Sequence, residues 1–323
     1  MGFFVPYLRQ NGHLDHLHTT VCLVGSRKLL EEDDYGNAGW SVLAPNLTIY
    51  GVDADADACY EANANIQARQ VSWEEEHFPI ALGKQSEETT LYVTDHPACT
   101  SLYPPNIPFA NRLFGFEKSM QLSLTIEIEV TTLDEFYALA DLKEIDFLQI
   151  DVQGADLDVL QGATNLLQQS ILGVQIEVEF SSLYVNQPLF TNIDLYLRQQ
   201  GFTLFDLITT NPWCRVPRSC LPIQSSTRAG QLVWADACYL RDPLGDGVPW
   251  FAQQNPNKML KLACIADILN FPDFAFEVLV HLASTHRNNP TYNTTSTLVE
   301  ALSEGLKMSE QDIKNISSLA KLQ

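Results

Sequence analysis

The stretch from Ile145 to Asp206 alternates strand-like and helix-like segments, and this alternation most constrains the fold. An apolar run, Ile145–Ile150, stops at Asp151, and leucines at helical spacing follow it. A second strand-like run, Ile171–Phe180, precedes a second helical pattern around Ile193–Leu197 and then a third strand. Strand, helix, strand, helix, strand is typical of a parallel sheet with helical crossovers. We therefore predict a doubly wound α/β sheet, mostly parallel.

Acidic residues stand where two of these strands end. In open parallel sheets, ligands bind outside the carboxyl ends of the strands. This rule predicts Asp151 and Glu179 on the functional edge. Glu177 and Glu179 share one face of their strand, because residues two apart point the same way. Two buried acids need partners, so we expect one of them to face the site or a buried cation.

The front of the chain contains a short β-like run, Val21–Val24, followed by Gly25. A strand and a glycine turn suit a ligand that lies close to the backbone, although the G-x-G-x-x-G pattern is absent. Gly36 and Gly39, in the segment that follows, are candidates for such an approach and equally for plain turns.

The second strand, Leu47–Val52, ends at Asp53. A carboxylate at this position suits the two vicinal hydroxyls of a ribose. Asp55 or Asp57 fits better as the cap of the helix Ala58–Ala68, although either could be the ribose ligand instead.

The remaining segments predict further elements and three regions of the chain. We expect strands at Phe78–Gly83, Leu91–Thr94, Leu122–Val130 and Leu232–Leu240, and a helix from Thr132 to Leu142 whose first turn holds a Thr132–Glu135 capping box. Prolines argue against regular structure between Asn211 and Arg228. Helical patterns occupy the end of the chain. The expected division is an N-terminal segment at 1–20, a sheet domain at 21–242 and a helical extension at 243–323.

Several of these segments also resemble a known family. The block FLQIDVQGADLDVLQGA from Phe147, then IEVEFSSLYVNQPLF from Ile176 and GFTLFDL from Gly201, is similar to the FkbM family of S-adenosylmethionine-dependent methyltransferases. GVDADADAC from Gly51 and VTDHPACTSLY from Val93 extend the resemblance, which covers roughly Val21 to Arg241.

The resemblance implies a Rossmann-like methyltransferase sheet, S-adenosyl-L-methionine as the cofactor and a cofactor glycine at Gly25. It also places Ser101 in a loop over the cofactor. Asp151 would lie nearest the transferred methyl group, either orienting or deprotonating the acceptor, or merely anchoring the following turn. The predicted catalytic residues are Asp151 and Glu179; the predicted cofactor-binding residues are Gly25, Asp53, Ala81, Leu82, Ser101 and Asp151.

Composition limits the partners. The formal net charge of −21 argues against nucleic acid and anionic membrane surfaces, and no apolar run reaches the roughly 20 residues of a membrane span. The N-terminus lacks the pattern of a signal peptide, and seven scattered cysteines fit reduced thiols, so we expect a cytoplasmic protein. The expected substrate is a small-molecule hydroxyl: a metabolite, sugar or glycolipid. The helical C-terminus is a possible homo-oligomer contact.

Three alternatives remain open from the sequence. A nucleotide-binding oxidoreductase could use a similar sheet, and an inert binding protein would result if the altered loop after Gly25 could not hold the cofactor. A divalent cation held by Asp151, Glu179 and His96 is a further possibility, but no local spacing supports it and no metal site is predicted. Neither is one predicted for His13, His16 and His18.

Overall fold

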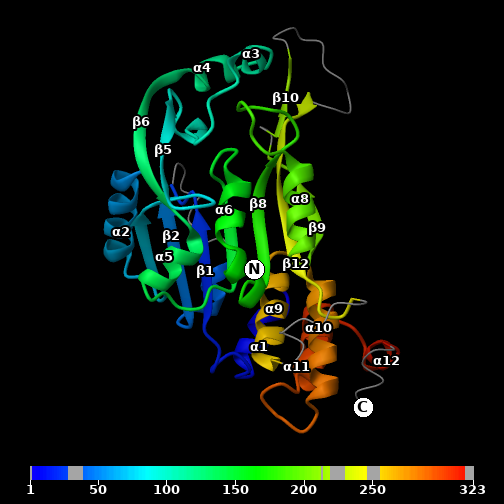
Figure 1. The fold of residues 1–323 in the computed structure, drawn as a ribbon. Helices are drawn as coiled ribbons and strands as arrows, with labels where there is room; N and C mark the ends of the chain where they lie inside the picture. Colours follow the sequence, from blue (N-terminus) through cyan, green and yellow to red (C-terminus); the bar gives the residue numbers. More distant parts are fainter. Residues whose placement is uncertain (1, 28–38, 212–213, 219–229, 246–254, 317–323) are drawn as a thin grey trace.

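A computed structural model describes residues 2–27, 39–211, 214–218, 230–245 and 255–316. Its main sheet has seven strands, and five neighbouring strands pair in parallel (Figure 1). The strand next to the edge, β12, runs antiparallel to both neighbours. The order is β3 (Glu74–Pro79), β2 (Leu47–Asp53), β1 (Thr19–Val24), β7 (Phe147–Ile150), β8 (Gly173–Glu179), β12 (Trp234–Arg241) and β9 (Phe202–Ile208). The predicted doubly wound sheet is confirmed.

Helices cover both faces because the central strands are apolar on both sides. In β1, Cys22 and Val24 point to one face and Val21 and Leu23 to the other, and all four are buried. The first face packs against α5 (Leu133–Leu139), α6 (Asp156–Gly162), α7 (Thr164–Gln169) and α8 (Phe190–Gln199). The second packs against α1 (Val5–Gln10), α9 (Pro256–Ile268) and α10 (Pro272–Thr285).

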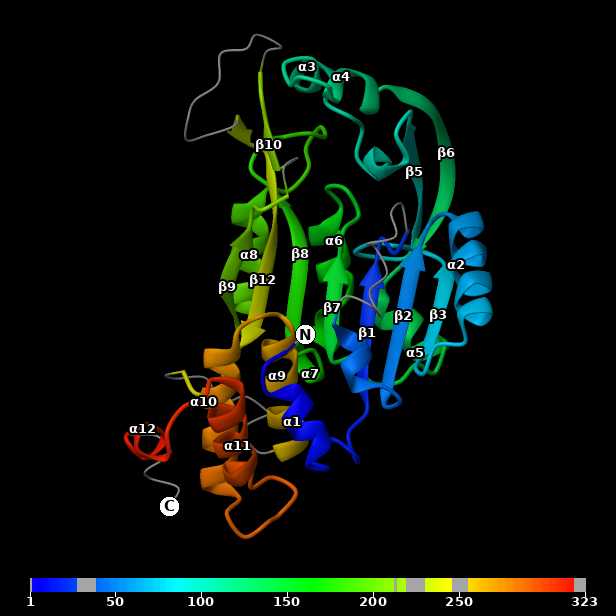
Figure 2. The same ribbon diagram turned by 180° about the vertical axis from the view of Figure 1, so that it is seen from behind.

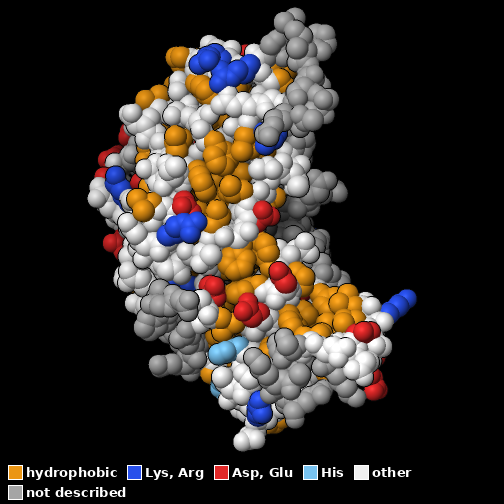
Figure 3. All heavy atoms as spheres, turned by 90° about the vertical axis from the view of Figure 1, so that its right-hand side faces the viewer, with side chains coloured by type: hydrophobic (Ala, Val, Ile, Leu, Met, Phe, Trp, Pro, Cys, Tyr) orange, Lys and Arg blue, Asp and Glu red, His pale blue; other side chains and the backbone are white. Residues whose placement is uncertain are grey.

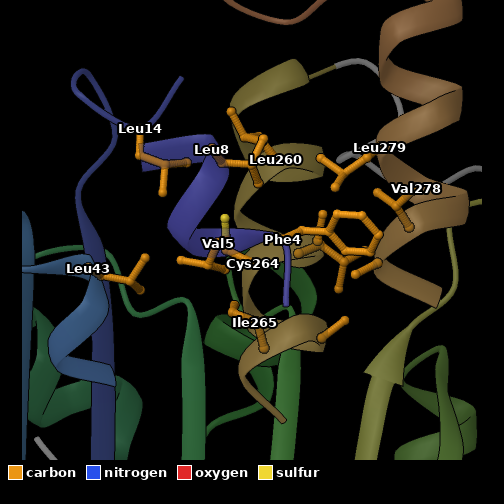
Figure 4. Close-up of a cluster of buried hydrophobic side chains, with 14 of the residues drawn as sticks. Phe4, Val5, Leu8, Leu14, Leu43, Leu260, Cys264, Ile265, Val278 and Leu279 are labelled. Carbon is orange, nitrogen blue, oxygen red and sulfur yellow. The ribbon is translucent and has the colours of Figure 1, made fainter. Parts of the chain in front are cut away.

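The C-terminal helices form one apolar cluster with the N-terminal helix (Figure 4). Phe4, the N-cap of α1, and Val5 belong to this cluster, together with residues of α9, α10 and α11 (Thr295–Gly305). The short helix α12 (Glu310–Lys314) follows α11. The Asp267 carboxylate accepts hydrogen bonds from the backbone N–H groups at the start of α1, at 2.7 to 2.8 Å. This bundle lies at the amino-terminal end of the central strands, away from the edge expected to bind ligands (Figure 2).

Buried charges join this bundle to the sheet. Asp146, which is fully buried beside β7, accepts from Lys258 Nζ at 3.1 Å and from Lys261 Nζ at 2.7 Å. A buried ion pair loses several kcal/mol when one partner is removed, because the other charge stays behind. The helices from α9 onward therefore share a core and a charge network with the sheet.

A smaller layer stands beyond the carboxyl ends of the central strands (Figure 1). It is a three-stranded sheet in the order β4 (Ala81–Leu82), β6 (Leu122–Thr131), β5 (Glu87–Thr94). The short helices η3 (Pro97–Cys99), α3 (Ile107–Ala110) and α4 (Phe116–Ser119) connect its strands, while α2 (Ala56–Arg69) follows β2 and η2 (Trp40–Leu43) precedes it. This layer turns the open edge of the main sheet into a cleft.

Two predictions about strands were wrong. The predicted strand Phe78–Gly83 is divided: β3 ends at Pro79, and β4 begins at Ala81 in the other sheet. Ile80 N donates to Phe78 O at 3.0 Å, which makes a tight turn between them. The region Asn211–Arg228 also contains regular structure, since β10 (Arg215–Val216) pairs with β11 (Gln231–Leu232).

Candidate active site

A cavity of about 690 Å³ lies at the carboxyl ends of β1, β2 and β7, below the three-stranded sheet. The parallel register brings the residues after these strands to one level, and the small sheet and the loop after β5 close the far side. All six residues predicted to bind the cofactor line this cavity: Gly25, Asp53, Ala81, Leu82, Ser101 and Asp151. Residues scattered over more than a hundred positions thus meet in one place.

Gly25 allows the first loop to pass close to the end of β7. Its φ is +81°, and a Cβ at this position would lie 1.8 Å from the carbonyl oxygen of Asp151. Gly25 N donates to Val52 O, and Asp151 N donates to Val24 O, both at 2.9 Å. A side chain here would clash with backbone in a conformation that L residues disfavour, so the loop requires glycine.

Asp53 presents a carboxylate at the end of β2. Its Oδ1 accepts from Asp55 N at 2.8 Å and its Oδ2 from Arg27 N at 3.1 Å. Burial raises the pKa of Asp53, and these two backbone donors oppose that shift. Each oxygen keeps a lone pair for a ligand hydroxyl. The residue therefore suits a ribose, as its position predicts.

The neighbouring acid has a different role. Asp55 Oδ1 accepts from Ala58 N at 3.1 Å and caps α2, while its Oδ2 pairs with Arg27 Nη1 at 2.7 Å. The predicted cap is confirmed, and both carboxylate oxygens of Asp55 are engaged.

Apolar side chains from two segments line the cavity. Ile80, Ala81 and Leu82, which follow β3, line the cavity, and so do Leu91, Val93 and Ile126 of β5 and β6. The apolar surface of Ile80, Ala81 and Leu82, next to the Asp53 carboxylate, fits a planar base joined to a ribose.

Ser101 lines the cavity while it supports a turn. Its hydroxyl donates to Gln153 O at 2.6 Å and accepts from Tyr103 N at 3.0 Å. The single hydroxyl proton is therefore in use, and Ser101 can meet a ligand only as an acceptor.

Asp151 belongs to a hydrogen-bond chain at the floor of the cavity. Gln153 Nε2 donates to Asp151 Oδ1 at 2.7 Å and to Glu177 Oε2 at 2.8 Å. The Tyr184 hydroxyl lies 3.0 Å from Gln153 Oε1 and 3.1 Å from Cys99 O. Tyr184 is fully buried, and its hydroxyl supports this hydrogen-bond chain.

Four further carboxyl groups surround Asp151. Burial, followed by the charge of Asp151, raises the pKa of Asp156 and of Asp236 to about 7. The same causes raise the pKa of Glu177 well above its ordinary value. Burial and the charges of Asp156 and Asp151 do so for Glu179. Asp151, which is exposed, is thus the acid of this group that meets the cavity.

Glu179 does not line the cavity. It is 1% exposed, and among the described residues neither of its carboxylate oxygens has a well-formed hydrogen bond, although the Gln187 amide lies close by. The structure therefore separates the two predicted catalytic residues: Asp151 reaches the cavity wall and Glu179 lies behind it. No described cation pairs with Glu179 or with Glu177.

A buried network that the sequence did not reveal holds the first loop. His77 of β3 lies 3.1 Å from Ser26 Oγ through Nδ1 and 3.0 Å from Glu75 Oε1 through Nε2. His77 reaches across β2 because Gly51 has no side chain: a Cβ there would lie 2.1 Å from the ring. The residue after Gly25 is thereby tied to the sheet edge.

Other candidate residues fall outside this cavity. Gly36 lies outside the described residues, and Gly39 lies beside Ile268, away from the cavity lining. His13 bonds to Thr297 at 2.9 Å in the helical bundle. Within the described ranges, no three His, Cys, Asp or Glu side chains are grouped so as to hold a metal ion.

Fold and site define a class of protein: a doubly wound α/β protein with a cofactor cavity suited to an adenosyl group. The model of the FkbM methyltransferase domain matches residues 42–204, which is half of the chain. The protein therefore belongs to the FkbM methyltransferase family, whose members depend on S-adenosylmethionine, as the resemblance implied. The matched range includes every predicted site residue except Gly25.

Known structures show limited similarity to this chain. Methyltransferase FkbM from Methylobacillus flagellatus has a TM-score of 0.38 and 13% identity; the match covers 74% of this chain and 48% of that protein. TrmK from M. capricolum in complex with S-adenosylhomocysteine has a TM-score of 0.32 and 10% identity, with 97% and 94% covered. A methyltransferase from Clostridium acetobutylicum has a TM-score of 0.31 and 7% identity, with 74% and 91% covered. No curated protein matches the chain.

Proposed function

We propose that this methyltransferase transfers a methyl group to a hydroxyl of a small molecule, in the class of metabolites, sugars and glycolipids. The observation that carries the proposal is the single cavity into which Gly25, Asp53 and Asp151 converge from β1, β2 and β7. A carboxylate that meets the cavity next to the cofactor loop is the group that an oxygen acceptor needs.

Each of the cavity residues would bind a different part of the cofactor. Asp53 would accept hydrogen bonds from the ribose hydroxyls, and Ala81 and Leu82 would contact the adenine. Gly25 would let the loop backbone approach the remainder of the cofactor, and Ser101 would accept one hydrogen bond. The two free lone pairs of Asp53 and the apolar wall support this arrangement.

Asp151 is the proposed catalytic residue. Bound S-adenosylmethionine supplies a methyl group already activated by the positive sulfonium. Asp151 would orient the acceptor hydroxyl in line with that methyl group and accept its proton as the new carbon–oxygen bond forms. Gln153 Nε2 donates to Oδ1 of Asp151 and would hold the carboxylate in this orientation.

We propose a positioning role for Glu179. Its burial keeps it from a bound acceptor, but it stands beside Gln187 beneath the Asp151 network. Through this network, Glu179 would affect how Asp151 is held.

The proposed partners follow from charge and surface. A net charge of −21 disfavours nucleic acid, and none of the described helices is long and apolar enough to cross a membrane. We propose a cytoplasmic protein. Hydrophobic side chains gather on the surface in the region of edge strand β9 and α10 (Figure 3), which supports the proposal of a homo-oligomer that involves the C-terminal helices. We propose three regions: an N-terminal segment at 1–20, a sheet domain at 21–242 and a helical extension at 243–323 that packs on the sheet.

Calorimetry tests the proposed function. S-adenosylhomocysteine and S-adenosylmethionine should bind the protein, and NAD should not. Asp53→Ala should weaken S-adenosylhomocysteine binding by about 1–3 kcal/mol, the range for lost hydrogen bonds to a charged group. Asp57→Ala, in the same cavity wall, should leave the affinity nearly unchanged. If the two substitutions weakened S-adenosylhomocysteine binding equally, Asp53 would not be the ribose contact.

A further inference from the structure

The small sheet presents an apolar surface beside the cofactor cavity. In the antiparallel register, Leu91 of β5 lies opposite Ile126 of β6. Two residues further along, Val93 lies opposite Leu124. Paired residues point to the same face of a sheet, so these four side chains form one surface, which we call the β5–β6 face.

The β5–β6 face is unusually open for an apolar surface. Leu124 is 50% exposed and Ile126 is 43% exposed. The opposite face of the same strands is polar: Thr90 Oγ1 donates to Glu127 Oε1 at 2.9 Å. A strand that alternates in this way normally buries its apolar side against the protein. Here the apolar side is turned toward the cleft and remains half uncovered.

The β5–β6 face is continuous with the cofactor cavity. Leu91, Val93 and Ile126 line that cavity, but Leu124 does not. Leu124 therefore lies just outside the cavity and continues its apolar surface. The floor of the cavity, by contrast, is polar, with the Asp151 carboxylate and the Gln153 amide. A molecule that spans the two needs a hydroxyl at one end and hydrocarbon at the other.

We propose that the β5–β6 face binds the hydrocarbon part of the methyl acceptor, and that the acceptor is an amphiphile. This inference rests on the proposed function, because it places the acceptor hydroxyl at Asp151. The occupant is the acceptor because the surface shares three side chains with the cofactor cavity and continues past it at Leu124.

Straight-chain alcohols test this proposal, since each combines one hydroxyl with a variable hydrocarbon length. Protein saturated with S-adenosylhomocysteine is titrated with 1-butanol, 1-hexanol and 1-octanol, and binding is followed by calorimetry. Affinity should rise by up to about fourfold for each methylene that becomes buried. Leu124→Ser should flatten this dependence, and Leu124→Met should restore it. Leu195→Ser, at a 59% exposed leucine of α8, should leave it unchanged.

The possible outcomes separate the two proposals. If S-adenosylhomocysteine does not bind, the proposed function fails. If it binds but alcohol affinity does not depend on chain length, or if Leu124→Ser and Leu195→Ser behave alike, only the present inference is overturned. A loss of S-adenosylhomocysteine affinity in Leu124→Ser would assign the surface to the cofactor and also overturn it. Leu124 is half exposed, so its substitutions should fold, which the melting temperature checks.

Discussion

The side-chain amide of Gln153 joins Asp151 to Glu177, donating to the first at 2.7 Å and to the second at 2.8 Å. Asp151 lines the cavity, whereas Glu177 is only 8% exposed. Gln153 itself has a φ of +56° and is held by the Ser101 hydroxyl through its carbonyl. The proposed base is therefore fixed by a residue whose backbone is itself constrained.

Replacing Gln153 with leucine should destabilise the protein. The change removes both donors and leaves Glu177 buried without this partner, which should lower the free energy of unfolding by about 1–3 kcal/mol. Urea denaturation measures the loss. Gln161→Leu, at an exposed position of α6, is the control and should change stability by about 0.5 kcal/mol or less. Equal stability of the two variants would show that the Gln153 bridge contributes little.

Gly25→Ala should be much more disruptive than an alanine at another glycine with positive φ. Gly115 has a φ of +88°, but a Cβ there meets no atom within 4 Å. Gly115→Ala should therefore cost only the conformational term, about 1–2 kcal/mol. Gly25→Ala adds the collision with Asp151 O and should also abolish S-adenosylhomocysteine binding. Thermal unfolding and calorimetry compare the two variants; similar stability and retained binding would contradict the close approach at Gly25.

Stability should depend on pH through Asp236. Its pKa is about 7 in the folded protein, because of burial and the charge of Asp151, and about 4 in an unfolded chain. Between these values the folded state holds a proton that the unfolded state releases. The free energy of unfolding should therefore fall as pH rises from about 4 to about 7 and then level off. Urea denaturation between about pH 5 and pH 8 should show that the free energy of unfolding falls less steeply with pH in Asp236→Asn than in the unchanged protein. An equal dependence on pH in the two proteins would contradict the raised pKa of Asp236.

The sequence predicted the parts of the site that depend on local pattern. The ends of the predicted strands identified Asp53 and Asp151, which both line the cavity. The capping pattern identified Asp55 as the helix cap. Each of these signals lies within a few neighbouring residues. The strand β3 was placed too late because Glu74, Glu75 and Glu76 do not look like a strand. On the edge of the sheet such charges are tolerated, and Glu75 is stabilised by His77 and by Trp73 Nε1 at 2.8 Å.

Contacts between segments that are distant in the sequence could not be predicted from local sequence patterns. The burial of His13 depends on Thr291 and Thr297, which are almost three hundred residues further along the chain. The His77–Ser26 contact depends on the sheet order and on the missing side chain of Gly51. Likewise, the strand that contains Glu179 was predicted, but its burial depends on distant segments: Trp234 of β12 pairs with it, and the Gln187 amide lies close by.

Asp151→Asn provides the most direct test of the central claim, that Asp151 orients or deprotonates the acceptor hydroxyl. The substitution keeps the shape of the side chain and removes its charge. With an accepted hydroxyl substrate, the single-turnover rate should fall by about 10²–10⁴, while the S-adenosylhomocysteine affinity and the melting temperature change little. Near-normal turnover in a folded Asp151→Asn protein would contradict the account.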